Sequence, residues 1–348
     1  NYISKYGENL YDLVDGGLRY DLTVPLARYY SNHANELPSP FKALQIGSVW
    51  RADRPQKGRF RQFTQCDIDI LGDATNLAEI EEILALTKAL KRICPDKAYT
   101  VRVNDRAILK GMADYSGFPE NETDKVFIIL DKMDKIGLDG VREELLAEGY
   151  APEAVEKYTG LLAEIQNDAA GVRALGEKLS GVMDPAKAEN LATIMETVKA
   201  VADIEFGLEF DPTLVRGMGY YTGTIFEVSM EGFGGSVAGG GRYDKLIGKF
   251  TGVDTPACGF SIGFERIITI LMDSGFKVPE AAGKKAFLYE KGLSADQFRA
   301  VLKKAQEERA NGTRVAVAQM NKNKKFQKEQ LAKDGYEEIV EFYKDSLK

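Results

Sequence analysis

The sequence predicts an α+β fold in which a largely antiparallel sheet carries helices, with a small α/β region attached. Three observations lead to this prediction. Alternating, strand-like segments occupy much of residues 1–105 and return after residue 205. The intervening residues 106–200 are polar and helical in pattern, which predicts an inserted helical domain. Residues 284–348 alternate between strand-like and helical segments.

The composition is that of a globular protein with room for two or three domains. Hydrophobic residues make up 44% of the 348 residues and charged residues 28%. We find no apolar run long enough to span a bilayer and no signal peptide, so we expect a cytoplasmic protein without a membrane partner. The three cysteines, Cys66, Cys94 and Cys258, match neither a zinc cluster nor a disulfide framework. The single histidine, His33, is interpreted as a surface or capping residue.

A hairpin is predicted over Trp50–Ile70. The run FKALQIGSVWR is extended, Pro55 and Gly58 supply turn chemistry, and the chain then returns as an alternating strand. One face of the returning strand carries Arg61, Phe63, Gln65, Asp67 and Asp69, and the other carries Thr64, Cys66, Ile68 and Ile70. Arginines beside aromatic rings suit phosphate oxygens and a flat ring. These features favour a nucleotide-phosphate site, and a solvated hairpin is the simpler alternative.

A helix is predicted over Leu77–Ile93. Asn76 and Glu79 have the spacing of a capping box. The expected buried stripe consists of Leu77, Ile80, Ile83, Leu84, Leu90 and Ile93. A strand is expected at Tyr99–Val103, and the next strands are expected from Glu205–Phe210 onwards.

A second informative stretch follows residue 213. LVRGMGYYTG places Arg216 in a turn punctuated by glycines, just before an alternating strand. The glycines at 239–241 let a backbone pass close to a ligand, although they also suit an ordinary bend. Residues 257–263 form a small-residue strand that runs into a helix beginning near Glu265 and Arg266.

The last part of the chain is basic although the whole chain has a net charge of −7. Residues 284–348 contain fifteen Lys/Arg against ten Asp/Glu. A hinge at residues 275–283 leads to a β-α-β-α-β pattern. Its densest positive cluster consists of Lys322, Lys324, Lys325 and Lys328. A basic region on an acidic body favours a polyanionic partner, and a solvated helix face is the alternative.

Taken together, four segments resemble the class II histidyl-tRNA synthetases: YDLTVPLARYY, the hairpin, LVRGMGYYTG and GGGRYD with GFSIGFER. The hairpin resembles the family's motif 2 and residues 257–271 its motif 3. The resemblance implies a class II synthetase core at 1–105 and 201–274, a helical insertion domain at 106–200 and an anticodon-binding-like α/β domain at 284–348. It also implies a homodimer that ligates L-histidine to tRNA(His) with ATP and Mg²⁺, through a histidyl-adenylate.

The resemblance assigns the nucleotide site to arginines. Arg51 would hold the α-phosphate, and Arg59 and Arg266 would bind the rest of ATP near Asp53. Arg216 resembles the family's second catalytic arginine, which acts where other class II enzymes use a metal. The four lysines of the basic cluster would contact tRNA.

The resemblance assigns the histidine site to acidic, polar and aromatic residues. Asp69 would accept a hydrogen bond from the imidazole, beside Tyr221 and its neighbour Tyr220. Asp21, Thr23 and Gln65 would bind the amino and carboxylate end. Because Asp21 and Thr23 are two positions apart, we expect them on one face of a strand.

Some features depart from the family. No counterpart of motif 1 precedes Asn1, so we expect the sequence to be a fragment. Gly219 stands where many members have an acidic residue, and the last domain is short. The alternative function is that of a non-catalytic relative, the regulatory subunit of ATP phosphoribosyltransferase. The retained Arg51, Arg216, YYTG run and basic last domain favour the ligase.

Overall fold

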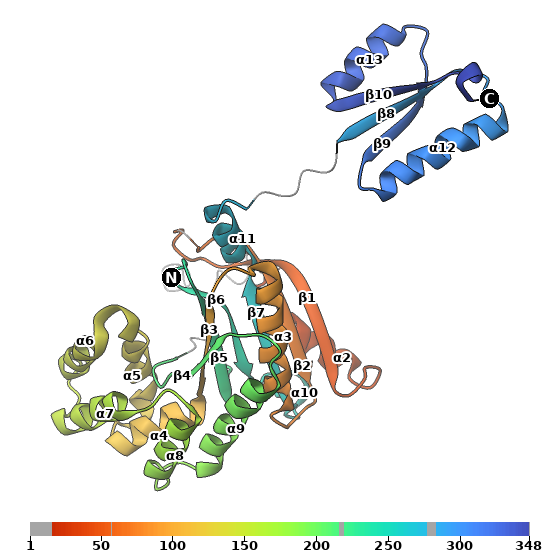
Figure 1. Ribbon diagram of the computed structural model, residues 1–348. Coiled ribbons are helices and arrows are strands. Elements are labelled where there is room, and N and C mark those ends of the chain that lie inside the picture. Colours follow the sequence, from red (N-terminus) through yellow and green to blue (C-terminus); the bar gives the residue numbers. More distant parts are fainter. Residues whose placement is uncertain (1–15, 57, 216–218, 277–282, 348) are drawn as a thin grey trace. The chain divides into compact units, whose positions relative to one another are not determined.

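The computed structural model describes residues 16–56, 58–215, 219–276 and 283–347. The chain divides into two compact units, Asn1–Asp273 and Ser274–Lys348, each with its own sheet (Figure 1). No helix of the described residues is long and apolar enough to cross a membrane.

A seven-stranded sheet forms the centre of the first unit. Its strands are β1 (Phe41–Trp50), β2 (Gln62–Leu71), β3 (Tyr99–Asp105), β4 (Gly207–Phe210), β5 (Thr224–Met230), β6 (Ser236–Arg242) and β7 (Ala257–Gly263). The order across the sheet is β1-β2-β7-β6-β5-β3-β4, and every neighbouring pair is antiparallel except β3 with β4. The predicted α+β class with a largely antiparallel sheet is therefore confirmed.

The helices of the first unit come before, between and after these strands. They are α2 (Thr23–His33), α3 (Leu77–Ile93), α4 (Arg106–Ser116), α5 (Thr123–Leu130), α6 (Met133–Ala147), α7 (Pro152–Glu164), α8 (Ala169–Lys178), α9 (Pro185–Val201), α10 (Gly248–Thr251) and α11 (Phe264–Asp273), with a 3-10 turn at Glu120–Glu122. Helix α3 packs on β2, β7 and α9, and α9 also contacts β3 (Figure 1). Helices α4–α9 share one continuous apolar core with the sheet.

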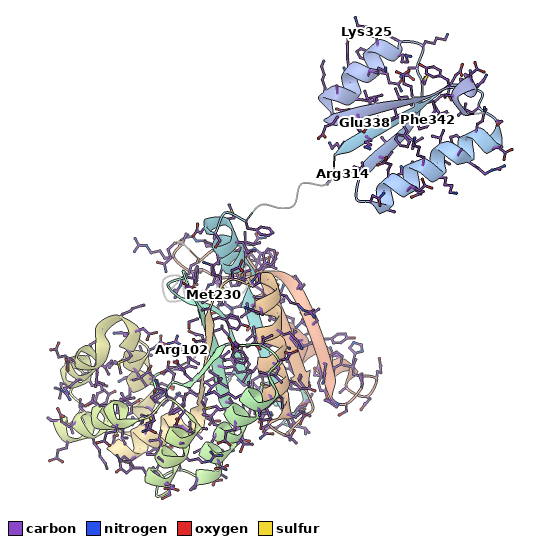
Figure 2. The ribbon with its side chains drawn as sticks, in the orientation of Figure 1. Arg102, Met230, Arg314, Lys325, Glu338 and Phe342 are labelled. Atoms are coloured by element: carbon purple, nitrogen blue, oxygen red, sulfur yellow. The ribbon has the colours of Figure 1, made fainter. Side chains whose placement is uncertain are left out.

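An arginine on β3 ties this helical segment to the sheet. The Arg102 guanidinium donates to Asp211 at 3.1 Å, to Glu227 of β5 at 2.9 Å and to Asp134 of α6 at 3.2 Å. Arg102 is labelled in Figure 2. The boundaries of a separate helical domain at 106–200 remain a prediction.

The helix predicted at Leu77–Ile93 has the same bounds in the structure and Asn76 is its N-cap residue, but the predicted capping box is absent. Asn76 has a helical backbone and no capping hydrogen bond, and its side-chain amide donates instead to Asn190 at 3.1 Å. Glu79 is buried and binds Arg242. Leu77 and Ile93, expected in the buried stripe, are 49% and 42% exposed. Tertiary partners therefore override the local capping pattern.

The Glu79–Arg242 ion pair joins the start of α3 to the end of β6. Both carboxylate oxygens of Glu79 accept from the guanidinium at 2.6 Å, and Arg242 also donates to the carbonyls of Asp73 and Thr75. The Glu79 side chain is 1% exposed and that of Arg242 is 11% exposed. Removal of Glu79 would leave the buried guanidinium with the more exposed Asp244, at 3.2 Å, as its remaining carboxylate partner.

Replacing Glu79 with alanine should therefore lower the free energy of unfolding by about 3–5 kcal/mol. The double replacement Glu79→Leu with Arg242→Met should recover much of that loss, because no charge is then left unpaired. Urea unfolding of the three proteins measures both effects. The exposed pair Lys88–Asp203 is the control, and Asp203→Ala should change stability by less than about 0.5 kcal/mol. A loss at Glu79 as small as that at Asp203 would contradict this account.

The second unit contains a three-stranded parallel sheet with the order β10-β8-β9. Its elements are β8 (Lys284–Tyr289), α12 (Ala295–Ala310), β9 (Arg314–Gln319), α13 (Lys324–Lys333), β10 (Tyr336–Phe342) and a 3-10 turn at Lys344–Leu347. Its core contains Phe287, Val301, Ala305, Val315 and Phe342. The predicted β-α-β-α-β order is therefore observed.

Candidate functional site

A pocket of about 360 Å³ lies on the polar face of β2. It collects residues from the hairpin, from the start of α2, from β6 and β7 and from the first turn of α11. The predicted site residues that line it are Thr23, Arg51, Asp53, Arg59, Gln65, Asp69, Tyr220, Tyr221 and Arg266. Further lining residues include Tyr20, Phe63, Asp67, Ser236, Gly239, Tyr243, Gly259, Ser261 and Glu265.

Strand alternation explains why polar residues face this pocket. In the register of β2 with β7, Gln65, Asp67 and Asp69 lie opposite Gly263, Ser261 and Gly259. Paired residues of antiparallel strands point to the same face, so these six share the pocket face. The intervening positions point towards α3, where Ile70 and Cys258 are buried.

Glycines are required here by close contacts in the sheet. A Cβ on Gly259 would lie 2.0 Å from Oδ1 of Asp69, so only glycine leaves room for that carboxylate. A Cβ on Gly240 would lie 2.0 Å from the Gly259 carbonyl oxygen. Gly241 has φ 159°, and its Cβ would meet the Thr224 carbonyl oxygen at 2.6 Å. Of the three consecutive glycines only Gly239 lines the pocket, and the other two serve the packing of neighbouring strands.

Arg51 stands at the cationic end of the pocket between two aromatic rings. Its guanidinium carbon lies 4.2 Å from the centre of the Tyr20 ring and 5.0 Å from that of Phe63. Its Nε donates to the Tyr20 carbonyl oxygen at 3.3 Å. Contact with two rings limits the rotamers of this side chain and holds its charge at the pocket wall.

The first turn of α11 is fastened to the hairpin. Both oxygens of the Glu265 carboxylate accept from the Thr64 amide, at 2.8 and 3.0 Å. Arg266 donates to the Gly58 carbonyl oxygen at 3.2 Å and to the Ser236 carbonyl oxygen at 2.5 Å. Arg266 therefore spans from the hairpin turn to β6 across the cationic end of the pocket.

Asp69 forms the acidic end of the pocket. It is 2% exposed, and Tyr243 donates its hydroxyl to Oδ1 at 2.6 Å. Oδ2 is buried and has no hydrogen-bond partner among the described residues. Burial raises the pKa of Asp69 to about 7 and the nearby Asp21 carboxylate adds to this rise, while the side chains of Tyr243 and Gln45 oppose it. The ring centres of Tyr220 and Tyr221 are 5.0 Å apart, and Tyr220 lies 5.9 Å from Tyr243.

The expected strand at Asp21 and Thr23 is wrong, because helix α2 begins at Thr23. Asp21 precedes the helix, and its Oδ1 accepts from the Val24 amide at 3.0 Å. Gln65 fixes this segment: its Oε1 accepts from the Leu22 amide at 3.2 Å, and its Nε2 donates to Ser261 at 3.2 Å. Asp21 is buried behind the wall to which Thr23 contributes.

Sequence reasoning missed several residues that build the site. Tyr243 lies in the GGGRYD run and orients Asp69, and Asp67 lies on the face already predicted to be polar. Strand alternation placed Asp67 on the pocket face and would have been sufficient to include it among the site residues. Tyr243 could not be found in this way, because it is 174 positions from Asp69. Arg216 lies outside the described residues.

Comparison with known proteins agrees with this geometry. The family model described as histidyl-tRNA synthetase matches residues 14–267. The chain belongs to the histidyl-tRNA synthetase family. A "Histidine--tRNA ligase" of Leifsonia xyli subsp. xyli is 43% identical over 332 residues, which cover 93% of this chain and 74% of that protein. A "Probable histidine--tRNA ligase" of Tropheryma whipplei is 43% identical over 272 residues, which cover 76% of this chain and 63% of that protein.

A solved structure of a family member has the same fold. The histidyl-tRNA synthetase from Nostoc sp. PCC 7120 superposes with a TM-score of 0.73 at 28% identity, covering 91% of this chain and 74% of that one. The predicted class II synthetase core is thereby confirmed as the fold of the first unit.

In the present chain, the positive charge of the basic cluster is partly neutralised by other residues of the second unit. Lys324 donates to Glu341 of β10 and to the Tyr343 hydroxyl, both at 2.6 Å, and Lys328 also contacts Glu341. Lys322 and Lys325 are exposed, and Lys325 projects outward from α13 (Figure 2). The exposed charge of this cluster is therefore smaller than its lysine count indicates.

Proposed function

We propose that this chain joins L-histidine to tRNA(His) in two steps, through a histidyl-adenylate formed from ATP. The observation that carries the proposal is the polarity of the pocket. Its cationic end holds Arg51 between aromatic rings, and its acidic end holds Asp69 with one buried acceptor oxygen unpaired among the described residues. The relatives named histidine–tRNA ligase support the same conclusion.

The first step requires positioning rather than a protein nucleophile. An oxygen of the histidine carboxylate attacks the α-phosphorus, the bond from this phosphorus to the bridging oxygen breaks, and pyrophosphate leaves with the electron pair. The carboxylate is already ionised, so no proton must be removed. Charge builds up on the phosphate oxygens, and fixed cations stabilise it. We assign Arg51 to the α-phosphate, and Arg59 and Arg266 to the rest of ATP, near Asp53.

In the second step a hydroxyl of the terminal ribose of tRNA attacks the carbonyl of the adenylate. The new ester bond forms as the bond between the carbonyl carbon and the phosphate oxygen breaks. AMP leaves with the electron pair, and the proton of the hydroxyl is released to solvent. Arg216 is the proposed second cation at the reacting centre, by resemblance alone.

The acidic end suits an imidazole. A neutral imidazole has one N–H donor and one acceptor nitrogen. The unpaired Oδ2 of Asp69 accepts the N–H, and a tyrosine hydroxyl of the Tyr220–Tyr221 pair faces the other nitrogen. Thr23 and Gln65, supported by Asp21, bind the amino and carboxylate end. An apolar analogue would leave Asp69 unpaired, so the pocket rejects it.

Magnesium enters the proposal as a companion of ATP. Within the described ranges no group of three His, Cys, Asp or Glu residues could hold a metal ion. Mg²⁺ commonly binds through one or two carboxylates together with substrate phosphates. Glu265 and Asp53 line the pocket near the arginines and are the carboxylates available for this purpose. The ion would neutralise charge on the phosphates when it is bound.

The second unit is the proposed anticodon-binding domain, with tRNA(His) as its partner and Lys322 and Lys325 as the exposed lysines of its basic cluster. A homodimer in the cytoplasm is proposed by resemblance to the family. The alternative, a regulatory subunit of ATP phosphoribosyltransferase, is less well supported, because the curated relatives are named as ligases and nine of the proposed site residues line one pocket.

Removal of the Asp69 carboxylate tests the function. Asp69→Ala should raise the KM for histidine by about 5- to 150-fold, because a buried hydrogen-bond partner is lost at a cost of roughly 1–3 kcal/mol. The KM for ATP should stay within twofold. Histidine-dependent ATP–pyrophosphate exchange measures both constants.

Replacement of the exposed Asp203 with alanine serves as the matched control. This variant should keep the wild-type KM for histidine and the wild-type KM for ATP. If the wild-type chain shows no exchange with histidine, the function is refuted. If Asp69→Ala weakens both substrates equally, the assignment of Asp69 to the imidazole is refuted.

A further inference from the structure

Asp67 is a carboxylate in the pocket without an assigned role. It lies on β2 midway between Gln65 and Asp69 and points to the same face. It is 2% exposed and lines the pocket. Its neighbours in register are Gln45 of β1 and Ser261 of β7.

One oxygen of Asp67 is unsatisfied. Within the described part of the chain, Oδ1 is buried and no hydrogen-bond donor reaches it, as is also true of Oδ2 of Asp69. Buried acceptors without a donor are rare in native proteins because each one costs free energy. Two such oxygens on neighbouring inward positions of one strand indicate a ligand that brings two donors.

The charges around Asp67 favour a cationic donor. Burial is the main cause that raises the pKa of Asp67, to about 7, and the nearby carboxylates of Asp69 and Asp21 add to this rise. Ser261 and Arg51 act in the opposite direction. Three buried carboxylates against one arginine leave this part of the pocket acidic, so a bound cation would relieve their mutual repulsion.

We propose that Asp67 is a substrate-binding residue whose carboxylate accepts a hydrogen bond from the α-ammonium group of the bound amino acid, while Asp69 accepts from its imidazole. The inference rests on the proposed function. Along β2 the side chains of Asp67 and Asp69 are about 6.6 Å apart, at ~3.3 Å per residue. Histidine carries its ammonium and imidazole donors at opposite ends of a short side chain, so one ligand satisfies both orphan oxygens.

The test combines a variant with a ligand analogue. Asp67→Asn keeps the shape of the side chain and removes its charge. The analogue is 3-(imidazol-4-yl)propionate, which lacks only the α-amino group and acts as a competitive inhibitor against histidine. Asp67→Asn should raise the KM for histidine about tenfold or more. The inhibition constant of the analogue and the KM for ATP should both stay within twofold of the wild-type values.

A stability measurement separates binding from a structural role. The pKa of Asp67 in the folded chain is about 7, above the value of about 3.9 for an unperturbed aspartate. Its favourable contribution to folding is present below pH 4 and is lost as the pH rises through 7. Asp67→Asn should therefore raise the Tm at pH 8, and a residue that merely holds the sheet together would lower it.

Three results would overturn the inference. The first is an equal loss of affinity for histidine and for the analogue, which would mean that Asp67 does not contact the ammonium group. The second is a higher KM for ATP or a lower kcat with an unchanged KM for histidine, which would mean that Asp67 acts through Arg51. The third is a lower Tm at pH 8. Exchange by the wild-type chain is measured first, so failure of the proposed function is recognised separately.

If Asp67→Asn does not fold, Asp67→Ser replaces it. The quantity compared is again the ratio of the KM for histidine to the inhibition constant of the analogue. The surface variant Asp203→Ala controls for general effects of losing an acidic side chain and should leave this ratio unchanged.

Discussion

Replacing Arg51 with alanine should lower histidine-dependent pyrophosphate exchange by about 10²–10³-fold, the usual loss when one donor to a developing negative charge is removed. The effect is large because Arg51 is held between Tyr20 and Phe63 at the pocket wall, so no neighbouring cation can take its place without reorganisation. The loss should appear in kcat, with the KM for histidine nearly unchanged.

Two further variants sharpen this experiment. Arg51→Lys keeps the charge but loses the planar fork, so it should recover only part of the rate. Arg54→Ala removes an exposed arginine of the same hairpin and should retain nearly full exchange. An Arg51→Ala enzyme with a rate close to that of Arg54→Ala would show that Arg51 only supports the hairpin.

Ending the chain at Asp273 should abolish most charging of tRNA while leaving adenylate formation. All described residues that line the pocket belong to the first unit, which has its own core, so histidine-dependent exchange should remain within a fewfold of the full chain. Charging of tRNA should fall severely, because the second unit supplies the proposed contacts to the anticodon. Aminoacylation and exchange are measured on the same preparations, and sizing establishes that the oligomeric state is retained.

Salt dependence gives this prediction a finer test. Each contact to a phosphate of single-stranded RNA contributes a slope of about −0.7 to the dependence of log affinity on log salt. If Lys322 and Lys325 each contact one phosphate, the double variant Lys322→Gln with Lys325→Gln in the full chain should lose about two of these contacts. The slope of log affinity against log salt should then be less steep by about two such contributions. Equal charging by the truncated and the full chain would mean that the second unit stabilises the protein and does not bind tRNA.

Local sequence patterns were sufficient for much of the architecture. The alternation in the hairpin predicted the face on which Gln65, Asp67 and Asp69 line the pocket. The apolar periodicity predicted α3 with the observed bounds, and the order of elements in the second unit was also predicted. These features depend on side chains a few positions apart, whose relative direction is set by the backbone repeat of a strand or helix.

Local patterns failed where a distant partner competes for the same group. Glu79 has the spacing of a capping residue, but Arg242 binds it because a buried guanidinium requires a carboxylate. Asp21 and Thr23 have strand-like spacing, yet the chain turns into α2 between them. Lys324 and Lys328 have the pattern of an RNA-binding cluster, yet Glu341 pairs with both.

The sequence by itself determined the fold class, the family resemblance and the residue types of the pocket. Only the tertiary structure decided which of these groups remain available for a ligand. Tyr243 uses one oxygen of Asp69 and leaves the other unpaired among the described residues, and Gly259 makes room for this arrangement. The reason is physical: periodicity along a strand sets the direction of a side chain, whereas its hydrogen-bond partners depend on the register of strands that are far apart in the chain.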